Sequence, residues 1–100
     1  DPEASFSSYM ITENGVADRT DTLRPAFITE HLAAIAAAQA EGVNVTGYIH
    51  WTVSDNPEWA DGYCPRFGLF SVNRSSPSLA RTPRPSAALF TDIARTRNVT

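Results

Sequence analysis

Residues 22–41 read TLRPAFITEHLAAIAAAQAE, the longest regular pattern in the chain. Asp21 or Thr22 can cap its start, and Gly42 can end it. Its apolar residues recur at the spacing of one helix face: Leu23, Phe27, Ile28, Leu32 and Ile35. The pattern therefore predicts a helix over residues 22–41.

Two β-prone runs flank this helix. Residues 8–12 (SYMIT) precede it and lead into Glu13 and the turn-prone pair Asn14-Gly15, and residues 43–52 (VNVTGYIHWT) follow it. Two strands joined by a helix of about 20 residues predict a βαβ unit with parallel strands. Both strands then end at the same edge, which would carry Glu13 and Trp51, and parallel α/β folds bind ligands at that edge.

The remainder of the chain alternates loops with short elements. Residues 54–63 (SDNPEWADGY) form a long loop that is dense in polar and aromatic residues. This composition indicates a functional loop and not only a connection between elements. We expect a short strand within residues 67–72, a linker rich in Pro and Ser over residues 75–85, and a final helix over residues 86–96.

Composition excludes several classes of protein. Hydrophobic residues make up 42% and charged residues 19%, which is typical of a globular chain of one domain at most. Eight Arg and no Lys against eleven acidic residues give a net charge of −3, so there is no general basic surface for nucleic acid. The longest apolar run, residues 32–38, predicts no transmembrane segment. With Cys64 alone, neither an internal disulfide nor a cysteine metal cluster can form.

Glu13 and Glu58 are the candidate carboxylates, and Trp51 and Trp59 are the candidate aromatic platforms. Carboxylates accept hydrogen bonds from paired hydroxyls, and indole rings cover the apolar faces of pyranoses. The combination predicts a carbohydrate site. The alternative is that both Trp residues pack in the core or at its rim, and that Glu13 is a solvated surface carboxylate.

His31 and His50 are the residues that could act as metal ligands or general bases. No third ligand follows at a zinc-like spacing, so packed or hydrogen-bonded histidines are the expected outcome. Ser54 lacks the Gly-x-Ser-x-Gly elbow, and the chain has no Gly-rich phosphate loop. We expect neither a metal nor a cofactor.

Several motifs agree with one family. They are YMITENG at 9–15, Arg24, GY at 47–48, WT at 51–52, DN at 55–56, EW at 58–59 and RFGL at 66–69. In this order they resemble the C-terminal part of family 1 glycoside hydrolases, the β-glucosidase family. The resemblance implies an α/β fold, a (β/α)8 barrel of which this chain holds the seventh strand to the last helix. Since such a barrel needs about 250 residues, we expect residues 1–100 to be a portion of a catalytic domain and not a complete one.

The resemblance also implies roles for individual residues. Glu13 would be the nucleophile of a retaining mechanism, and Glu58 would bind two sugar hydroxyls. Trp51 would form a wall of the sugar site, and Trp59 and Phe67 would also contact substrate. The acid/base Glu of the family lies on an earlier strand, so the 100 residues alone are expected to be inactive.

Three functions stay open. The first is hydrolysis of β-glycosides of the glucosidase or galactosidase type. The second is galactosyl transfer between galactolipids in the chloroplast outer envelope, because residues 51–56, 58–63 and 79–82 are similar to the plant freezing-tolerance branch of the family. Pro57, Arg66 and Asn73 depart from that branch, where an aromatic residue, Lys and Asp are expected. The third is sugar or partner binding without catalysis. Outside the transferase branch, a cytoplasmic or secreted location is expected.

Overall fold

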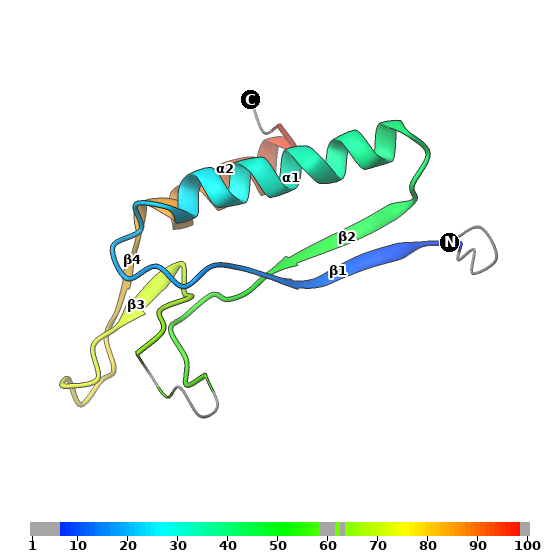
Figure 1. Cartoon of the computed structure of the whole chain (residues 1–100). Coiled ribbons are helices and arrows are strands. Elements are labelled where there is room, and N and C mark those ends of the chain that lie inside the picture. Colours follow the sequence, from blue (N-terminus) through cyan, green and yellow to red (C-terminus); the bar gives the residue numbers. More distant parts are fainter. Residues whose placement is uncertain (1–6, 59–61, 63, 99–100) are drawn as a thin grey trace.

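The computed structural model describes residues 7–58, 62 and 64–98. Along the chain the elements are β1 (Tyr9–Asn14), α1 (Arg24–Ala40), β2 (Val45–His50), β3 (Phe70–Val72), β4 (Arg81–Pro83) and α2 (Pro85–Thr96). Strands β1 and β2 pair in parallel, and β3 and β4 form an antiparallel pair (Figure 1). The predicted βαβ unit is therefore confirmed.

Helix α1 begins at Arg24, two residues after the predicted start. Arg24 and Ile28 are its buried residues, and His31, Leu32 and Ile35 continue the same face half-buried. The prediction that Leu23 belongs to the apolar stripe is wrong, because its side chain is 62% exposed. Arg24 occupies the buried position in its place.

The first turn of α1 is capped from a distance. One carboxylate oxygen of Asp18, Oδ2, accepts hydrogen bonds from the backbone N–H groups of Leu23 (2.7 Å) and Arg24 (3.1 Å). The predicted caps, Asp21 and Thr22, are wrong, since the N-cap position is Leu23 and no side chain of that residue can cap. Burial alone would raise the pKa of Asp18, but these hydrogen bonds outweigh it and lower the pKa.

The end of α1 follows the prediction at Gly42. This glycine has a φ of +98°, which only glycine adopts without strain. Its N–H donates to the carbonyl of Gln39 (3.0 Å), and the N–H of Val43 donates to that of Ala38 (3.1 Å). These two bonds are the Schellman arrangement, and they turn the chain back toward β2.

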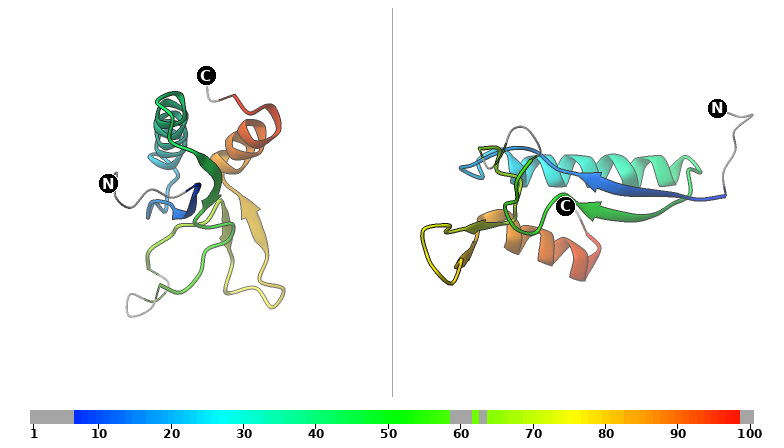
Figure 2. Two further views of the ribbon diagram at one scale, coloured as in Figure 1. Left: turned by 90° about the vertical axis from the view of Figure 1, so that its right-hand side faces the viewer. Right: turned by 90° about the horizontal axis from the view of Figure 1, so that it is seen from below.

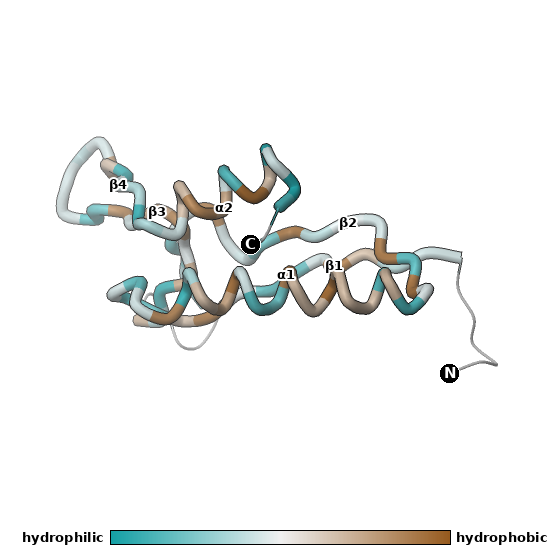
Figure 3. The backbone as a smooth tube through the Cα atoms, turned by 90° about the horizontal axis from the view of Figure 1, so that it is seen from above, coloured by the Kyte–Doolittle hydropathy of each residue, from teal (hydrophilic) through white to brown (hydrophobic). Residues whose placement is uncertain are grey.

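Both helices lie on the same side of the β1–β2 pair (Figure 2). Apolar residues recur along both helices (Figure 3), and the buried hydrophobic core among the described residues is Ile28, Leu69, Ala87 and Ile93. The molecule is elongated, with extents of 51 × 32 × 21 Å and a radius of gyration of 15.7 Å. A compact domain of this length would have a radius of gyration of about 13 Å.

The C-terminal half differs from prediction in one place. The final helix and the short strand are present, as α2 and β3, but the expected linker at 75–85 contains β4. Strand β4 forms because Arg81–Pro83 pairs with β3, Thr82 lying opposite Ser71. Neither helix in the described part of the chain has the length and apolar character needed to cross a bilayer.

Candidate active site

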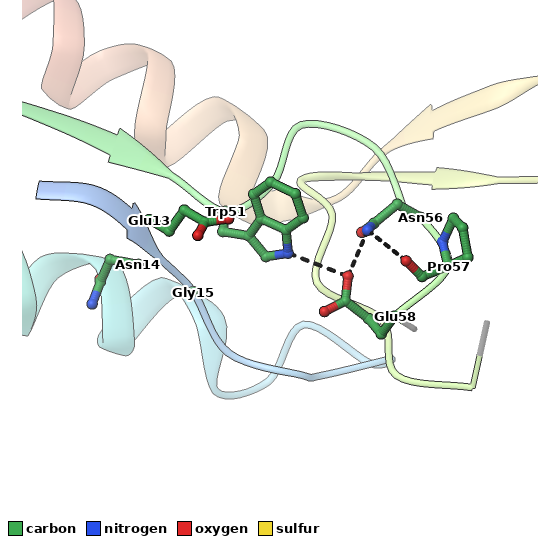
Figure 4. Close-up of a pocket in the computed structure, with 7 residues that line it drawn as sticks. All are labelled: Glu13, Asn14, Gly15, Trp51, Asn56, Pro57 and Glu58. Carbon is green, nitrogen blue, oxygen red and sulfur yellow. Dashed lines mark hydrogen bonds between the residues drawn. The ribbon is translucent and has the colours of Figure 1, made fainter. Parts of the chain in front are cut away.

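An open pocket of about 640 Å³ lies at the edge where β1 and β2 end (Figure 4). It is lined by Glu13, Asn14 and Gly15 from the end of β1, by Trp51 after β2, and by Asn56, Pro57 and Glu58 from the following loop. The parallel topology thus brings Glu13, Trp51 and Glu58 together.

Gly15 allows the two strand ends to approach each other closely. A Cβ atom at this position would lie 1.8 Å from the carbonyl oxygen of Trp51, so any side chain would displace the backbone. The Trp51 N–H donates to the carbonyl of Asn14 at 2.9 Å, and the Trp51–Thr52 peptide is cis. The predicted turn at Asn14-Gly15 is wrong: the chain leaves β1 without a turn, and the glycine serves the contact with Trp51.

Glu58 is held by donors from two neighbours. Its Oε2 accepts from Trp51 Nε1 at 3.3 Å and from Asn56 Nδ2 at 2.5 Å, and the backbone N–H of Glu58 donates to the carbonyl of Gly62 (2.6 Å). Within the described part of the chain, no hydrogen bond occupies Oε1. The carboxylate is therefore oriented, and one oxygen stays available to a hydroxyl donor.

The loop that carries Glu58 is closed at its base by paired backbone. Thr52 N–H donates to the carbonyl of Phe67 (3.3 Å), Leu69 N–H to that of Thr52 (2.9 Å), and Asp55 N–H to that of Phe70 (3.1 Å). The two arms at the base of the loop therefore run side by side.

Asp55 stabilises the base of this loop, and the residue is buried, with an exposed fraction of 7%. Oδ1 accepts from the Gly68 N–H and from Arg84 Nη1, and Oδ2 accepts from Arg84 Nη2, all at 2.9 Å. Burial alone would raise the pKa of Asp55, but the hydrogen bonds from Arg84 and Gly68 and the charges of Arg84 and Arg66 lower it. The forked Arg84 contact fixes the loop against the start of α2.

Arg24 holds the segment between β1 and α1 against the same loop. Its guanidinium is fully buried and donates to Asp21 Oδ1 (2.5 Å) and to three backbone carbonyls, those of Val16 (3.2 Å), Asp18 (2.7 Å) and Arg66 (2.6 Å). The Asp21 carboxylate in turn accepts from the N–H and the hydroxyl of Ser86, both at 2.7 Å. Arg24 is one of the residues that carry the family resemblance. Its hydrogen bonds to distant carbonyls could not be predicted from the sequence.

The two histidines are packed and hydrogen-bonded. His31 stacks on Phe27 at 3.9 Å between ring centroids, and its Nδ1 is 3.1 Å from Asn14 Nδ2. His50 is 7% exposed, and burial, with the charge of Arg24, lowers its pKa to about 4. No group of three or more His, Cys, Asp or Glu side chains in the described ranges could hold a metal ion.

Two further predicted sugar contacts, Phe67 and Trp59, stay predictions. The structure does not place Phe67 among the residues that line the pocket, and its carbonyl instead holds Thr52. Trp59 lies outside the described residues. Four residues that line the pocket were not predicted as site residues: Asn14, Gly15, Asn56 and Pro57. The first two directly follow Glu13 in the sequence, and the last two directly precede Glu58.

The sequence is similar to that of known proteins over almost its whole length. The family model described as Glycosyl hydrolase family 1 matches residues 4–99. The chain is 54% identical over 92 residues to a chloroplastic galactolipid galactosyltransferase of Arabidopsis thaliana, covering 92% of this chain and 15% of that protein. It has the same identity over 92 residues to a chloroplastic beta-glucosidase-like protein of Oryza sativa subsp. japonica, covering 14% of that protein.

Solved structures agree with these relatives. The hyperthermophilic beta-glucosidase from Pyrococcus furiosus matches with a TM-score of 0.86 and 44% identity, over 91% of this chain and 19% of that one. The chain thus spans less than a fifth of the length of each of these three proteins.

Proposed function

The chain belongs to glycosyl hydrolase family 1, and from this premise we propose that it forms the C-terminal part of a retaining β-glycosidase with Glu13 as nucleophile. One observation carries the proposal: two carboxylates line one pocket, and they differ in their hydrogen bonding. Glu58 is bound by Trp51 and Asn56, whereas Glu13 is exposed and, among the described residues, no hydrogen bond or ion pair occupies its carboxylate. A carboxylate in this state can reach a substrate carbon without first breaking a hydrogen bond within the described residues.

The reaction follows from these positions. A carboxylate oxygen of Glu13 bonds to the anomeric carbon as the glycosidic C–O bond breaks, and the electron pair leaves with the aglycone oxygen. That oxygen takes a proton from a general acid. Glu58 is engaged by two N–H donors, so we assign the acid to a residue outside this chain. Water or a sugar hydroxyl then bonds to the anomeric carbon and releases Glu13.

Glu58 and Trp51 suit recognition of the sugar. The available oxygen of Glu58 can accept a sugar hydroxyl, and the half-buried indole of Trp51 offers an apolar face to a pyranose ring. Trp59 is proposed as a further sugar contact because it follows Glu58 directly. Phe67 stays a predicted sugar contact on the family resemblance, although it is not among the residues that line this pocket.

We further assign β1 and β2 to the seventh and eighth strands of a (β/α)8 barrel and α2 to its last helix. Exposed apolar side chains support this assignment, since Tyr9, Met10 and Ile49 on the two strands are 43%, 54% and 48% exposed. Among the described residues, the core of four buried hydrophobic side chains is also small. Neighbouring strands and helices of a barrel would cover these surfaces.

The test uses the full-length protein that contains these residues. A 2-deoxy-2-fluoro aryl β-glycoside should trap the glycosyl ester on the peptide that carries Glu13, as found by mass spectrometry of a proteolytic digest. Glu13→Gln should lower turnover by about three orders of magnitude or more, whereas the control Glu41→Gln, at an exposed helix end, should retain normal activity. Label on another residue, or an active Glu13→Gln protein, would contradict the proposal.

Galactosyl transfer is the second candidate, and the 54% identity to a galactolipid galactosyltransferase favours it. It would use the same glycosyl ester, resolved by a sugar hydroxyl of a second galactolipid. Incubation with a monogalactolipid distinguishes the two candidates, because transfer yields lipids with more than one galactose and hydrolysis yields free galactose. Sugar binding without release of any product would favour the non-catalytic alternative.

A further inference from the structure

The pairing of β1 with β2 is irregular just where the candidate nucleophile lies. Ile11 pairs with Tyr48 and Asn14 pairs with His50, so β1 advances three residues while β2 advances two. The additional residue falls at Thr12 or Glu13. Such an irregularity re-aims a side chain, and it also removes the regular ladder that would otherwise fix that side chain's direction.

Asn14 is fixed at three points immediately after this irregularity. Its carbonyl accepts from the Trp51 N–H at 2.9 Å, its Oδ1 accepts from the Tyr48 hydroxyl at 2.9 Å, and its Nδ2 lies 3.1 Å from His31 Nδ1. The three partners come from the segment after β2, from β2 and from α1. Figure 4 shows the Asn14 side chain directed toward α1 and away from Glu58.

The hydrogen bonds of the Asn14 amide are mutually consistent. Because the Tyr48 hydroxyl donates to Oδ1, the amide nitrogen is the atom that faces His31, and it must donate to Nδ1. His31 therefore accepts at Nδ1, and its ring is held by stacking on Phe27. The amide is thus bound on both sides by side chains of limited freedom.

We propose that Asn14 is a positioning residue that fixes the Glu13 carboxylate through Tyr48 and His31, an inference that rests on the proposed nucleophilic role of Glu13. The Asn14 carbonyl and side-chain amide are both held, and both extend from the residue that directly follows Glu13, so they limit the movement of the main chain at the end of Glu13. Loss of this constraint would let the carboxylate leave the line of attack. A misplacement of about 1 Å costs on the order of 100-fold in rate.

The first experiment uses the full-length enzyme and an aryl β-glycoside. Asn14→Ala should lower kcat by about 10- to 100-fold with KM within about threefold of normal, and Tyr48→Phe should lower kcat by about 3- to 10-fold. Asn44→Ala is the matched control, since Asn44 Nδ2 donates to the Ser7 carbonyl at 2.6 Å and joins the far ends of the same two strands. It should keep kcat within about twofold. An equal loss in the control would overturn the proposal.

The second experiment asks whether Asn14 acts only through Glu13. In a Glu13→Ala background, azide can bond to the anomeric carbon as the phenolate leaves, so the position of the natural nucleophile no longer matters. Adding Asn14→Ala to Glu13→Ala should then leave the azide-rescued rate unchanged. A loss equal to that of Asn14→Ala alone would overturn the positioning role. If Asn14→Ala does not fold, Tyr48→Phe in both backgrounds decides.

The two proposals fail separately. Normal turnover of Asn14→Ala and Tyr48→Phe, with Glu13→Ala inactive until azide is added, would overturn the positioning role and leave the nucleophile assignment in place. Full turnover of Glu13→Ala without azide would overturn the nucleophile assignment, and the positioning role with it.

Discussion

Replacing Arg24 by methionine should destabilise the protein far more than replacing the equally spaced Arg95. Each arginine pairs with an aspartate three residues earlier, Asp21 and Asp92 respectively, but the first pair has side chains 0% and 2% exposed and the second has 74% and 67%. In Arg24→Met, Asp21 would stay buried with only the N–H and hydroxyl of Ser86, and three carbonyls would lose a charged donor.

The expected loss is about 3–5 kcal/mol for Arg24→Met, because breaking a buried pair leaves an uncompensated charge. Arg95→Met should change the free energy of unfolding by no more than about 0.5 kcal/mol, because exposed pairs contribute little. Urea unfolding of both variants of the full-length protein, followed by fluorescence and circular dichroism, measures the difference. A loss below about 1 kcal/mol for Arg24→Met would refute the view that this guanidinium joins the loops around the site.

Three further predictions concern the site and its supports. Gly15→Ala should cost about 1–3 kcal/mol of unfolding free energy, since its Cβ would lie 1.8 Å from the Trp51 carbonyl oxygen; an unchanged melting temperature would contradict the close approach. His50 has its pKa lowered to about 4, so protonation favours the unfolded chain: stability should fall as the pH drops from about 6.5 to about 4, by about 3 kcal/mol, and His50→Phe should flatten this part of the profile. Asp55→Asn should loosen the loop that carries Glu58 and raise KM by about tenfold, or about 1.4 kcal/mol, in steady-state kinetics; a normal KM would show that the Arg84 fork is dispensable.

The sequence predicted those parts of the fold that depend on local spacing. Helix α1, its end at Gly42 and the two parallel strands all follow from periodicity and turn chemistry within residues 8–52. The prediction that Leu23 lies on the buried face was wrong, because Arg24 is buried there instead. The burial of Arg24 depends on the Arg66 carbonyl, 42 residues away in the sequence. Strand β4 was missed for a similar reason. It forms by pairing with β3, and its own residues show no strand pattern.

The site shows the same division. Topology and residue type were enough to bring Glu13, Trp51 and Glu58 into one pocket. The hydrogen bonds that orient these side chains were not predictable. Asparagine is common in turns, so the presence of Asn14 and Asn56 does not by itself indicate a binding site. The hydrogen-bond partner of each amide depends on the fold.

The contacts of Arg24 also bear on how this protein can change in evolution. Three of its four acceptors are carbonyls of the main chain, at Val16, Asp18 and Arg66, and every residue type offers the same carbonyl. Mutations that keep the path of the backbone at these positions keep the three carbonyl acceptors of Arg24 Nη2 in place, whereas no other side chain has the planar donor set of arginine. The side chains at Val16, Asp18 and Arg66 can therefore change more freely than Arg24 itself, whose guanidinium joins the segments beneath the pocket.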